Sequence, residues 1–168
     1  KRYPELKGKK VSVLIWTTTP WTLPANLAIA FHPKHEYSAF QVDDEVFIAA
    51  KRLIPVISEE LGYQNPKILI TFKGEEMEGM KARHPFVDRE SVFVLADYVT
   101  LDQGTGCVHT APGHGLEDYQ TGLKYGLEIY CPLDDQGCYV DDGQIPADLV
   151  GLSVLEDGGW SDANKAVL

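Results

Sequence analysis

The stretch WTTTPWTLPAN, residues 16–26, places four threonines, two tryptophans and two prolines directly after the apolar run VSVLI of residues 11–15. The apolar, β-branched run predicts a strand, and strands commonly end in Gly, Asn, Asp or Ser, which turn easily or bond their own backbone. A strand that ends in hydroxyls and indoles is either a threonine-rich edge with buried tryptophans or one wall of a binding site. The rest of the chain has to decide between these two interpretations.

Short strands and a few helices fill the remaining sequence. Apolar or alternating runs bounded by Gly, Pro and Asp predict strands at 11–17, 37–42, 45–50, 67–73, 91–96, 106–110 and 137–140. Helical spacing predicts helices at 52–62 and 115–126 and a short one at 161–168 that begins with a capping serine. In the second helix, one side carries Leu116, Tyr119, Leu123 and Leu127. The pattern indicates an α+β fold.

The composition suits one globular domain over residues 1–168, because 44% of the residues are hydrophobic. No apolar run approaches the roughly 18 residues of a membrane span, and the basic N-terminal stretch precedes too short an apolar run for a signal peptide. We therefore expect a soluble, cytoplasmic protein without a membrane partner. The three cysteines Cys107, Cys131 and Cys138 lack metal-ligand spacing, which favours buried or half-buried free thiols and no metal site. The short terminal helix suggests a piece of something longer.

Charge is distributed unevenly along the chain. Residues 1–96 carry 13 basic and 12 acidic side chains, whereas residues 97–168 carry 2 basic and 13 acidic ones. A domain that held a long duplex by itself would need a basic face, since phosphate neutralisation supplies most non-specific affinity. If this chain binds nucleic acid, we expect it to engage a short end that another domain delivers.

The segment GTGCVHTAPGHGLEDY, residues 104–119, concentrates further chemistry. Gly104 and Gly106 flank Thr105, a spacing that lets backbone approach a ligand where a Cβ would block it. Neither a dinucleotide fingerprint nor a Walker pattern follows. His109 ends a predicted strand and Asp118 lies in the first turn of the next helix, so taken alone they could be a core histidine and a helix-capping carboxylate.

Together, WTTTPWTLPAN and LDQGTGCVHTAPGHGLEDY resemble the editing domain of bacterial isoleucyl-tRNA synthetases over nearly the whole chain. The related valyl and leucyl enzymes are similar in both elements, but their threonine-rich strand runs more like Thr-Thr-Arg-Pro. The HIGH and KMSKS signatures of the adenylate-forming site are missing. The resemblance implies an α+β fold with a β-barrel-like core of short, mostly antiparallel strands flanked by a few helices.

The resemblance also implies a site that receives the aminoacylated 3′-terminal adenosine of tRNA(Ile). It assigns hydrolysis of the valyl ester to Thr17, Thr18, Thr19 and Asp118, with the carboxylate of Asp118 pairing with the substrate's α-ammonium. His109 bounds the amino-acid side chain. The remaining implied substrate-binding residues are Trp16, Trp21, Asn26, Gly104, Thr105 and Gly106. The implied partners are this tRNA end, the noncognate valine moiety and the rest of the parent synthetase, and no cofactor is implied.

An editing pocket, in addition to the pocket that selects the amino acid for activation, is useful because a missing methylene changes the binding free energy by only about 1–3 kcal/mol. The choice of isoleucine over valine is the standard example of this limit. We expect an oriented water to act as the nucleophile, a mechanism that requires neither a metal ion nor a strong base. Two alternatives stay open. A threonine could act as nucleophile with His109 as base and Asp118 as its orienter, or the domain could bind the acceptor end without catalysis.

Overall fold

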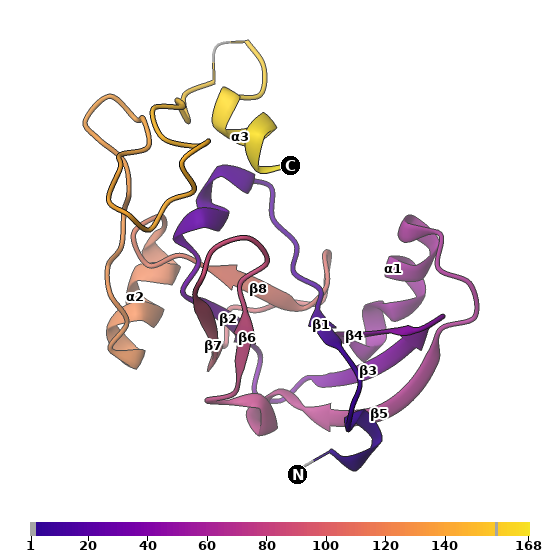
Figure 1. Ribbon diagram of the computed structural model, residues 1–168. Coiled ribbons are helices and arrows are strands. Elements are labelled where there is room, and N and C mark those ends of the chain that lie inside the picture. The colour runs from indigo at the N-terminus through magenta and orange to yellow at the C-terminus, as the bar shows by residue number, and fades with distance from the viewer. Residues whose placement is uncertain (1–2, 157) are drawn as a thin grey trace. The chain divides into compact units, whose positions relative to one another are not determined.

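The computed structural model describes residues 3–156 and 158–168, which divide into two compact units. Unit 1 contains residues 1–16, 29–82 and 92–109, and unit 2 contains residues 17–28, 83–91 and 110–168. Figure 1 shows the elements in chain order. The strands are β1 (Val11–Val13), β2 (Ala28–Phe31), β3 (Glu36–Val42), β4 (Glu45–Ala50), β5 (Lys67–Lys73), β6 (Lys81–Arg83), β7 (Glu90–Leu95) and β8 (Cys107–Thr110). The α-helices are α1 (Ile54–Leu61), α2 (Leu116–Tyr125) and α3 (Asp162–Val167), and the 3-10 helices are η1 (Pro4–Leu6), η2 (Pro20–Ala25), η3 (Lys51–Leu53) and η4 (Gly74–Met77).

Unit 1 is built on a four-stranded sheet in the order β1-β4-β3-β5. The hairpin β3–β4 turns through two residues, Asp43 and Asp44, and Asp43 adopts a left-handed conformation with φ 51°. Strand β5 is antiparallel to β3, and β1 is parallel to β4. Both faces of β3 and β4 are largely buried, and β4 carries a continuous apolar run after Glu45. The core of the unit includes Phe40, Phe47 and Phe72.

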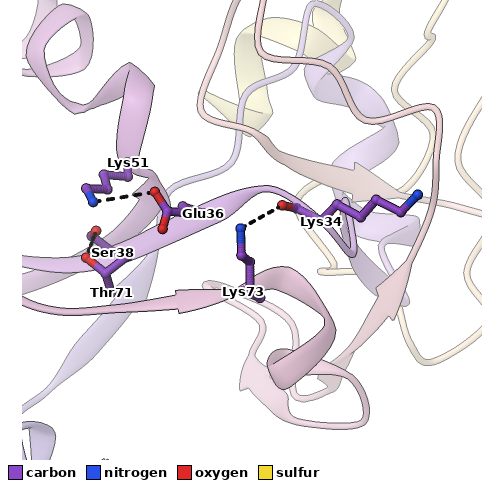
Figure 2. A network of polar contacts seen from close by, with 6 residues as sticks. All are labelled: Lys34, Glu36, Ser38, Lys51, Thr71 and Lys73. Atoms are coloured by element: carbon purple, nitrogen blue, oxygen red, sulfur yellow. Dashed lines mark hydrogen bonds and ion pairs between the residues drawn. The ribbon is translucent and has the colours of Figure 1, made fainter.

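Polar contacts join β3 to β5 and to η3, both at the surface and inside the unit (Figure 2). The hydroxyls of Ser38 on β3 and Thr71 on β5 form a hydrogen bond of 2.8 Å, and Ser38 is fully buried. Lys51 Nζ lies 3.4 Å from a carboxylate oxygen of Glu36, and both side chains are about half exposed. This ion pair therefore contributes little stability, whereas the buried hydroxyl pair would be costly to break.

A second four-stranded sheet has the order β6-β7-β2-β8. All four residues of β2, Ala28–Phe31, are buried. The chain passes from one compact unit to the other four times within these strands, since one unit boundary falls inside each of β2, β6, β7 and β8, and a fifth boundary lies between residues 16 and 17.

Unit 2 contains little regular structure beyond α2 and α3, and side chains bond its loops. Asp134 Oδ1 accepts hydrogen bonds from the amides of Gln136 and Cys138, both at 2.9 Å. Ser161 Oγ accepts from the Asn164 amide at 3.1 Å and caps α3, as its position in the sequence predicts. The unit has its own core, which includes Tyr130, Tyr139 and Leu149.

The predicted α+β class is confirmed, with short strands and few helices. In the described ranges, the strands form two separate sheets and no closed barrel. Several boundaries in the sequence prediction are wrong. The strand predicted at 11–17 ends at Val13, and 137–140 forms only isolated bridges, Leu133 with Tyr139 and Cys138 with Ser153. Strands β2 and β6 escaped prediction.

The second predicted helix is present as α2, but its apolar side faces solvent. Leu116, Tyr119 and Leu123 are 73%, 41% and 59% exposed, whereas Thr121 and Gly122 are buried. A Cβ at Gly122 would lie 2.7 Å from Pro112 Cβ, so the absent side chain permits a close approach of α2 to that loop. Packing of small residues, rather than the leucine stripe, orients this helix.

Candidate functional site

The threonine-rich segment turns by means of its own hydroxyls. Thr17 Oγ1 accepts a hydrogen bond from the Thr19 amide at 3.0 Å, which is the local side-chain turn that Ser and Thr favour. Thr19 O accepts from both the amide and the hydroxyl of Thr22, at 3.1 and 2.9 Å. Thr18 is exposed and its hydroxyl lies 3.4 Å from that of Thr19. The threonines therefore take the place of conventional turn residues while presenting hydroxyls at the surface of unit 2.

Trp21 follows these threonines and packs against His114 in the same unit. The two ring centroids lie 5.1 Å apart in an edge-to-face arrangement. The Trp21 backbone is fixed at both ends, since its amide donates to Asn164 Oδ1 at 3.0 Å and its carbonyl accepts from the Tyr139 hydroxyl. Burial lowers the pKa of His114, which favours the neutral imidazole at neutral pH. No role is predicted for His114 from the sequence, although the Pro-Gly turn before it could have indicated one.

Asp118 is half-buried and connects α2 to the end of β8. Its Oδ2 accepts a hydrogen bond of 2.8 Å from the amide of Ala111, a fully buried residue. The N-cap of α2 is Gly115, which offers no side-chain cap. The carboxylate of Asp118 therefore bonds to the chain that precedes α2 and not to the helix itself, while its place in the first turn still opposes the helix dipole.

The electrostatic setting of Asp118 favours binding of a cation. Burial raises the pKa of its carboxyl, the Ala111 amide opposes that rise, and neighbouring Glu117 adds to it. No ion pair with a Lys or Arg neutralises Asp118 among the described residues. Its hydrogen bond to Ala111 uses one of two oxygens. An ammonium group placed against the other oxygen would offset the desolvation that raises the pKa.

Asn26, a predicted substrate-binding residue of unit 2, is buried and bonded to protein. Its Nδ2 donates to Ala28 O at 2.9 Å, and its Oδ1 accepts from the Ser91 hydroxyl. The amide group thus joins the end of η2 to β2 and β7. Its role toward a substrate stays a prediction.

In unit 1, Trp16 lies beside the Gly-Thr-Gly loop. It forms an isolated parallel bridge with Val108 and is 44% exposed. Gly104 has φ +74°, and a Cβ there would lie 3.0 Å from Trp16 Cβ. Gly106 has φ +73°, and its Cβ would lie only 2.5 Å from Ala50 Cβ. At these two glycines the backbone therefore lies close to other residues of the protein, Trp16 and Ala50.

The loop between the glycines is anchored to β3 and β4. Thr105 O accepts from the Ala50 amide at 2.8 Å, and Gly106 O accepts from the Tyr37 hydroxyl at 2.8 Å. Thr105 is buried and its hydroxyl bonds to the backbone of Cys107. His109 is buried in β8. These hydrogen bonds hold the backbone of the loop against β3 and β4.

The structure thus divides the predicted site residues between two compact units. Unit 2 holds Thr17, Thr18, Thr19, Trp21, Asn26 and Asp118, and unit 1 holds Trp16, Gly104, Thr105, Gly106 and His109. Unit 2 is strongly acidic, with four Lys and Arg residues against thirteen Asp and Glu residues. Such a unit suits a cationic ligand group better than a phosphate backbone.

Other site types find little support in the described ranges. No group of three or more His, Cys, Asp or Glu side chains there is arranged to hold a metal ion. Cys107, Cys131 and Cys138 are free thiols. Cys107 is buried and Cys138 half-buried as predicted, whereas Cys131 is exposed. None of the described helices has the length and apolar character to cross a membrane.

Comparison with known proteins decides the family. A family model described as the editing domain of leucyl-tRNA synthetase matches residues 5–135. The chain belongs to this editing-domain family. Among curated proteins, the isoleucine–tRNA ligase of Petrotoga mobilis is 57% identical over 141 residues, covering 84% of this chain and 15% of the relative. The Moorella thermoacetica ligase is 49% identical over 157 residues, covering 94% of this chain and 16% of the relative. The predicted resemblance to a bacterial isoleucyl-type editing domain is confirmed.

Solved structures show the same editing-domain fold. The GlLeuRS-CP1 crystal structure has a TM-score of 0.60 at 21% identity, with 73% of this chain and 52% of that one covered. The P. falciparum cytosolic leucyl-tRNA synthetase editing domain has a TM-score of 0.59 at 15% identity, with 74% and 52% covered. The chain spans about one seventh of the length of the curated relatives it matches, between 14% and 16% of each.

Proposed function

We propose that this editing domain hydrolyses the ester that joins valine to the 3′-terminal adenosine of tRNA(Ile). The observation that carries the proposal is the half-buried Asp118 carboxylate, which has no cationic partner among the described residues and one oxygen bonded to Ala111. An aminoacyl ester brings an α-ammonium that complements this carboxylate. The threonine hydroxyls of the same unit complement the ester and ribose oxygens.

In the proposed reaction, Asp118 binds the substrate ammonium and the hydroxyls of Thr17, Thr18 and Thr19 orient the ester and an attacking water. Water adds to the ester carbonyl, the bond to the ribose oxygen breaks, and that oxygen takes a proton to leave free valine and tRNA. Positioning and hydrogen bonds to the developing oxyanion supply the acceleration. The proposal includes a cytoplasmic location for this activity.

The other predicted residues have binding roles in this proposal. Trp16 and Trp21 provide apolar walls, and His109 limits the size of the amino-acid side chain so that valine is accepted and isoleucine rejected. The rigid anchoring of Thr105 and Gly106 on β3 and β4 supports precise recognition of the terminal adenosine. The rest of the parent synthetase holds the body of the tRNA, because unit 2 is too acidic to do so.

The experiment is a single-turnover deacylation assay of valyl-tRNA(Ile) and isoleucyl-tRNA(Ile) with an excess of the chain. We expect slow hydrolysis of the valyl ester, little of the isoleucyl ester, and no ATP–pyrophosphate exchange. Acid quenching followed by mass spectrometry tests for an acyl-threonine, and its detection would replace the water mechanism by the nucleophilic one. Saturable binding without hydrolysis would identify a non-catalytic module instead.

A further inference from the structure

The turn that follows Thr17–Thr19 is hydrogen-bonded to the connection between β6 and β7. His84 Nε2 lies 2.9 Å from Leu23 O, and Arg89 Nη1 donates to Pro24 O at 3.1 Å and to Asn26 O at 3.3 Å. All of these residues belong to unit 2. We propose that His84 and Arg89 are positioning residues for the editing reaction, which hold η2 so that Thr17–Thr19 present their hydroxyls correctly. The inference rests on the proposed function.

The turn needs external support because of its own sequence. Pro20 and Pro24 of η2 have no amide hydrogen, so the six-residue 3-10 helix cannot satisfy its own backbone as an α-helix would. Thr19 O is tied to the turn through two bonds from Thr22. A displacement at Leu23 or Pro24 is therefore transmitted over a few residues to the threonines.

The hydrogen bonds around His84 assign its tautomer. The amides of Phe86 and Val87 point at Nδ1, at 3.3 and 3.1 Å, and an amide can only donate. Nδ1 is therefore an acceptor and the ring hydrogen lies on Nε2, which donates to Leu23 O. The imidazole is buried, so the ring has little freedom to leave this arrangement. Both nitrogens are used, one within the β6–β7 connection and one on the turn.

Arg89, which bonds the same turn, is itself held in place by unit 2. Its Nη2 donates to Gln144 Oε1 at 3.1 Å, and its guanidinium carbon lies 4.8 Å from the centroid of the Tyr130 ring. A guanidinium presents its donors in one planar fork, so holding one end orients the others. Arg89 thereby links two carbonyls at the end of the turn to the core of unit 2.

Two substitutions at His84 separate its two hydrogen bonds. His84→Asn keeps an acceptor near the position of Nδ1 but cannot reach Leu23, whereas His84→Gln keeps a donor near the position of Nε2. Ser38→Ala is the matched control, because it removes one buried hydrogen bond in unit 1, that to Thr71 (Figure 2). Arg89→Lys keeps the charge but loses the fork.

The readouts are kcat and KM for valyl-ester hydrolysis, together with amide hydrogen exchange of Thr22 and Asn26, which both bond within the turn. We expect His84→Asn and Arg89→Lys to lower kcat by about 10- to 100-fold with KM changed less than about threefold, since small misplacements of reacting groups have effects of this size. The two amides should exchange faster. His84→Gln should recover most of kcat, and Ser38→Ala should change neither readout.

Equal loss of kcat in His84→Asn and His84→Gln, or in Ser38→Ala, would overturn the inference, because the effect would then be general destabilisation. Unchanged exchange of Thr22 and Asn26 in His84→Asn would also overturn it. An inactive parent chain would instead overturn the proposed function, and the exchange data would then decide whether His84 restrains the turn at all.

Discussion

Replacing Asp118 by Asn removes the charge of this side chain while keeping an oxygen within reach of the Ala111 amide. The hydrogen bond at Ala111 is therefore retained. Burial raises the pKa of Asp118 above its unfolded value, so the charged form destabilises the folded state once the pH exceeds both pKa values. Asp118→Asn should consequently be at least as stable as the parent at neutral pH.

The catalytic effect of the same substitution should be large. A hydrogen bond to a charged group contributes about 1.5–3 kcal/mol, which corresponds to roughly 10- to 150-fold in kcat/KM for the valyl ester. The assay pairs deacylation time courses with thermal unfolding. A stable Asp118→Asn variant that hydrolyses the valyl ester at the parental rate would refute the ammonium-binding role.

Asp118→Ala is the informative companion. It leaves the amide of the fully buried Ala111 without its partner, at a cost of about 1–3 kcal/mol. For a chain of this size, each kcal/mol lowers the melting temperature by about 2–4 °C. We expect the Ala variant to be both inactive and less stable. Loss of activity in the Ala variant alone would indicate a structural role for the carboxylate.

Three further substitutions test other parts of the argument. His109→Ala should begin to hydrolyse isoleucyl-tRNA(Ile) while keeping part of its valyl activity, because binding of isoleucine gains up to about 0.8 kcal/mol per buried CH₂. A general-base role for His109 predicts instead that both activities fall together by about 100-fold. Paired deacylation time courses with the two esters distinguish these outcomes. Gly106→Ala should lower the free energy of unfolding by about 2 kcal/mol or more in a denaturant titration, because φ is +73° and the new Cβ meets Ala50. Gly126→Ala, with φ +63° and open space around it, should lower it by about 1 kcal/mol. Burial lowers the pKa of His84, so the stability it supports is lost as the pH falls below about 6.5; His84→Gln should flatten the stability–pH curve between pH 7 and 5, and an unchanged curve would show that His84 does not contribute.

The sequence-based prediction of the fold succeeded where local patterns matched tertiary burial. Strands β3, β4 and β5 and helix α1 lie close to their predicted positions because each carries an apolar or helical pattern that its packing uses. Helix α2 also lies at its predicted position, although its leucines face solvent and the buried residues are Thr121 and Gly122. Strand β2 was missed because its four residues follow the proline-rich turn and are too few to stand out. Residues 137–140 have strand-like composition, but side-chain-bonded turns around Asp134 leave them only isolated bridges.

The sequence by itself determined the family and the chemical inventory: clustered threonine hydroxyls, a Gly-Thr-Gly loop, and an aspartate on the following helix are local features readable in order. What only the tertiary structure decided is how these groups are held. Asp118 bonds to Ala111 rather than capping α2, and the side-chain amide of Asn26 is hydrogen-bonded to Ser91 and Ala28. The support from His84 to Leu23 joins residues 61 positions apart. Hydrogen bonds between distant segments form only when folding brings a donor and an acceptor to within about 3 Å, and no spacing in the sequence encodes that distance.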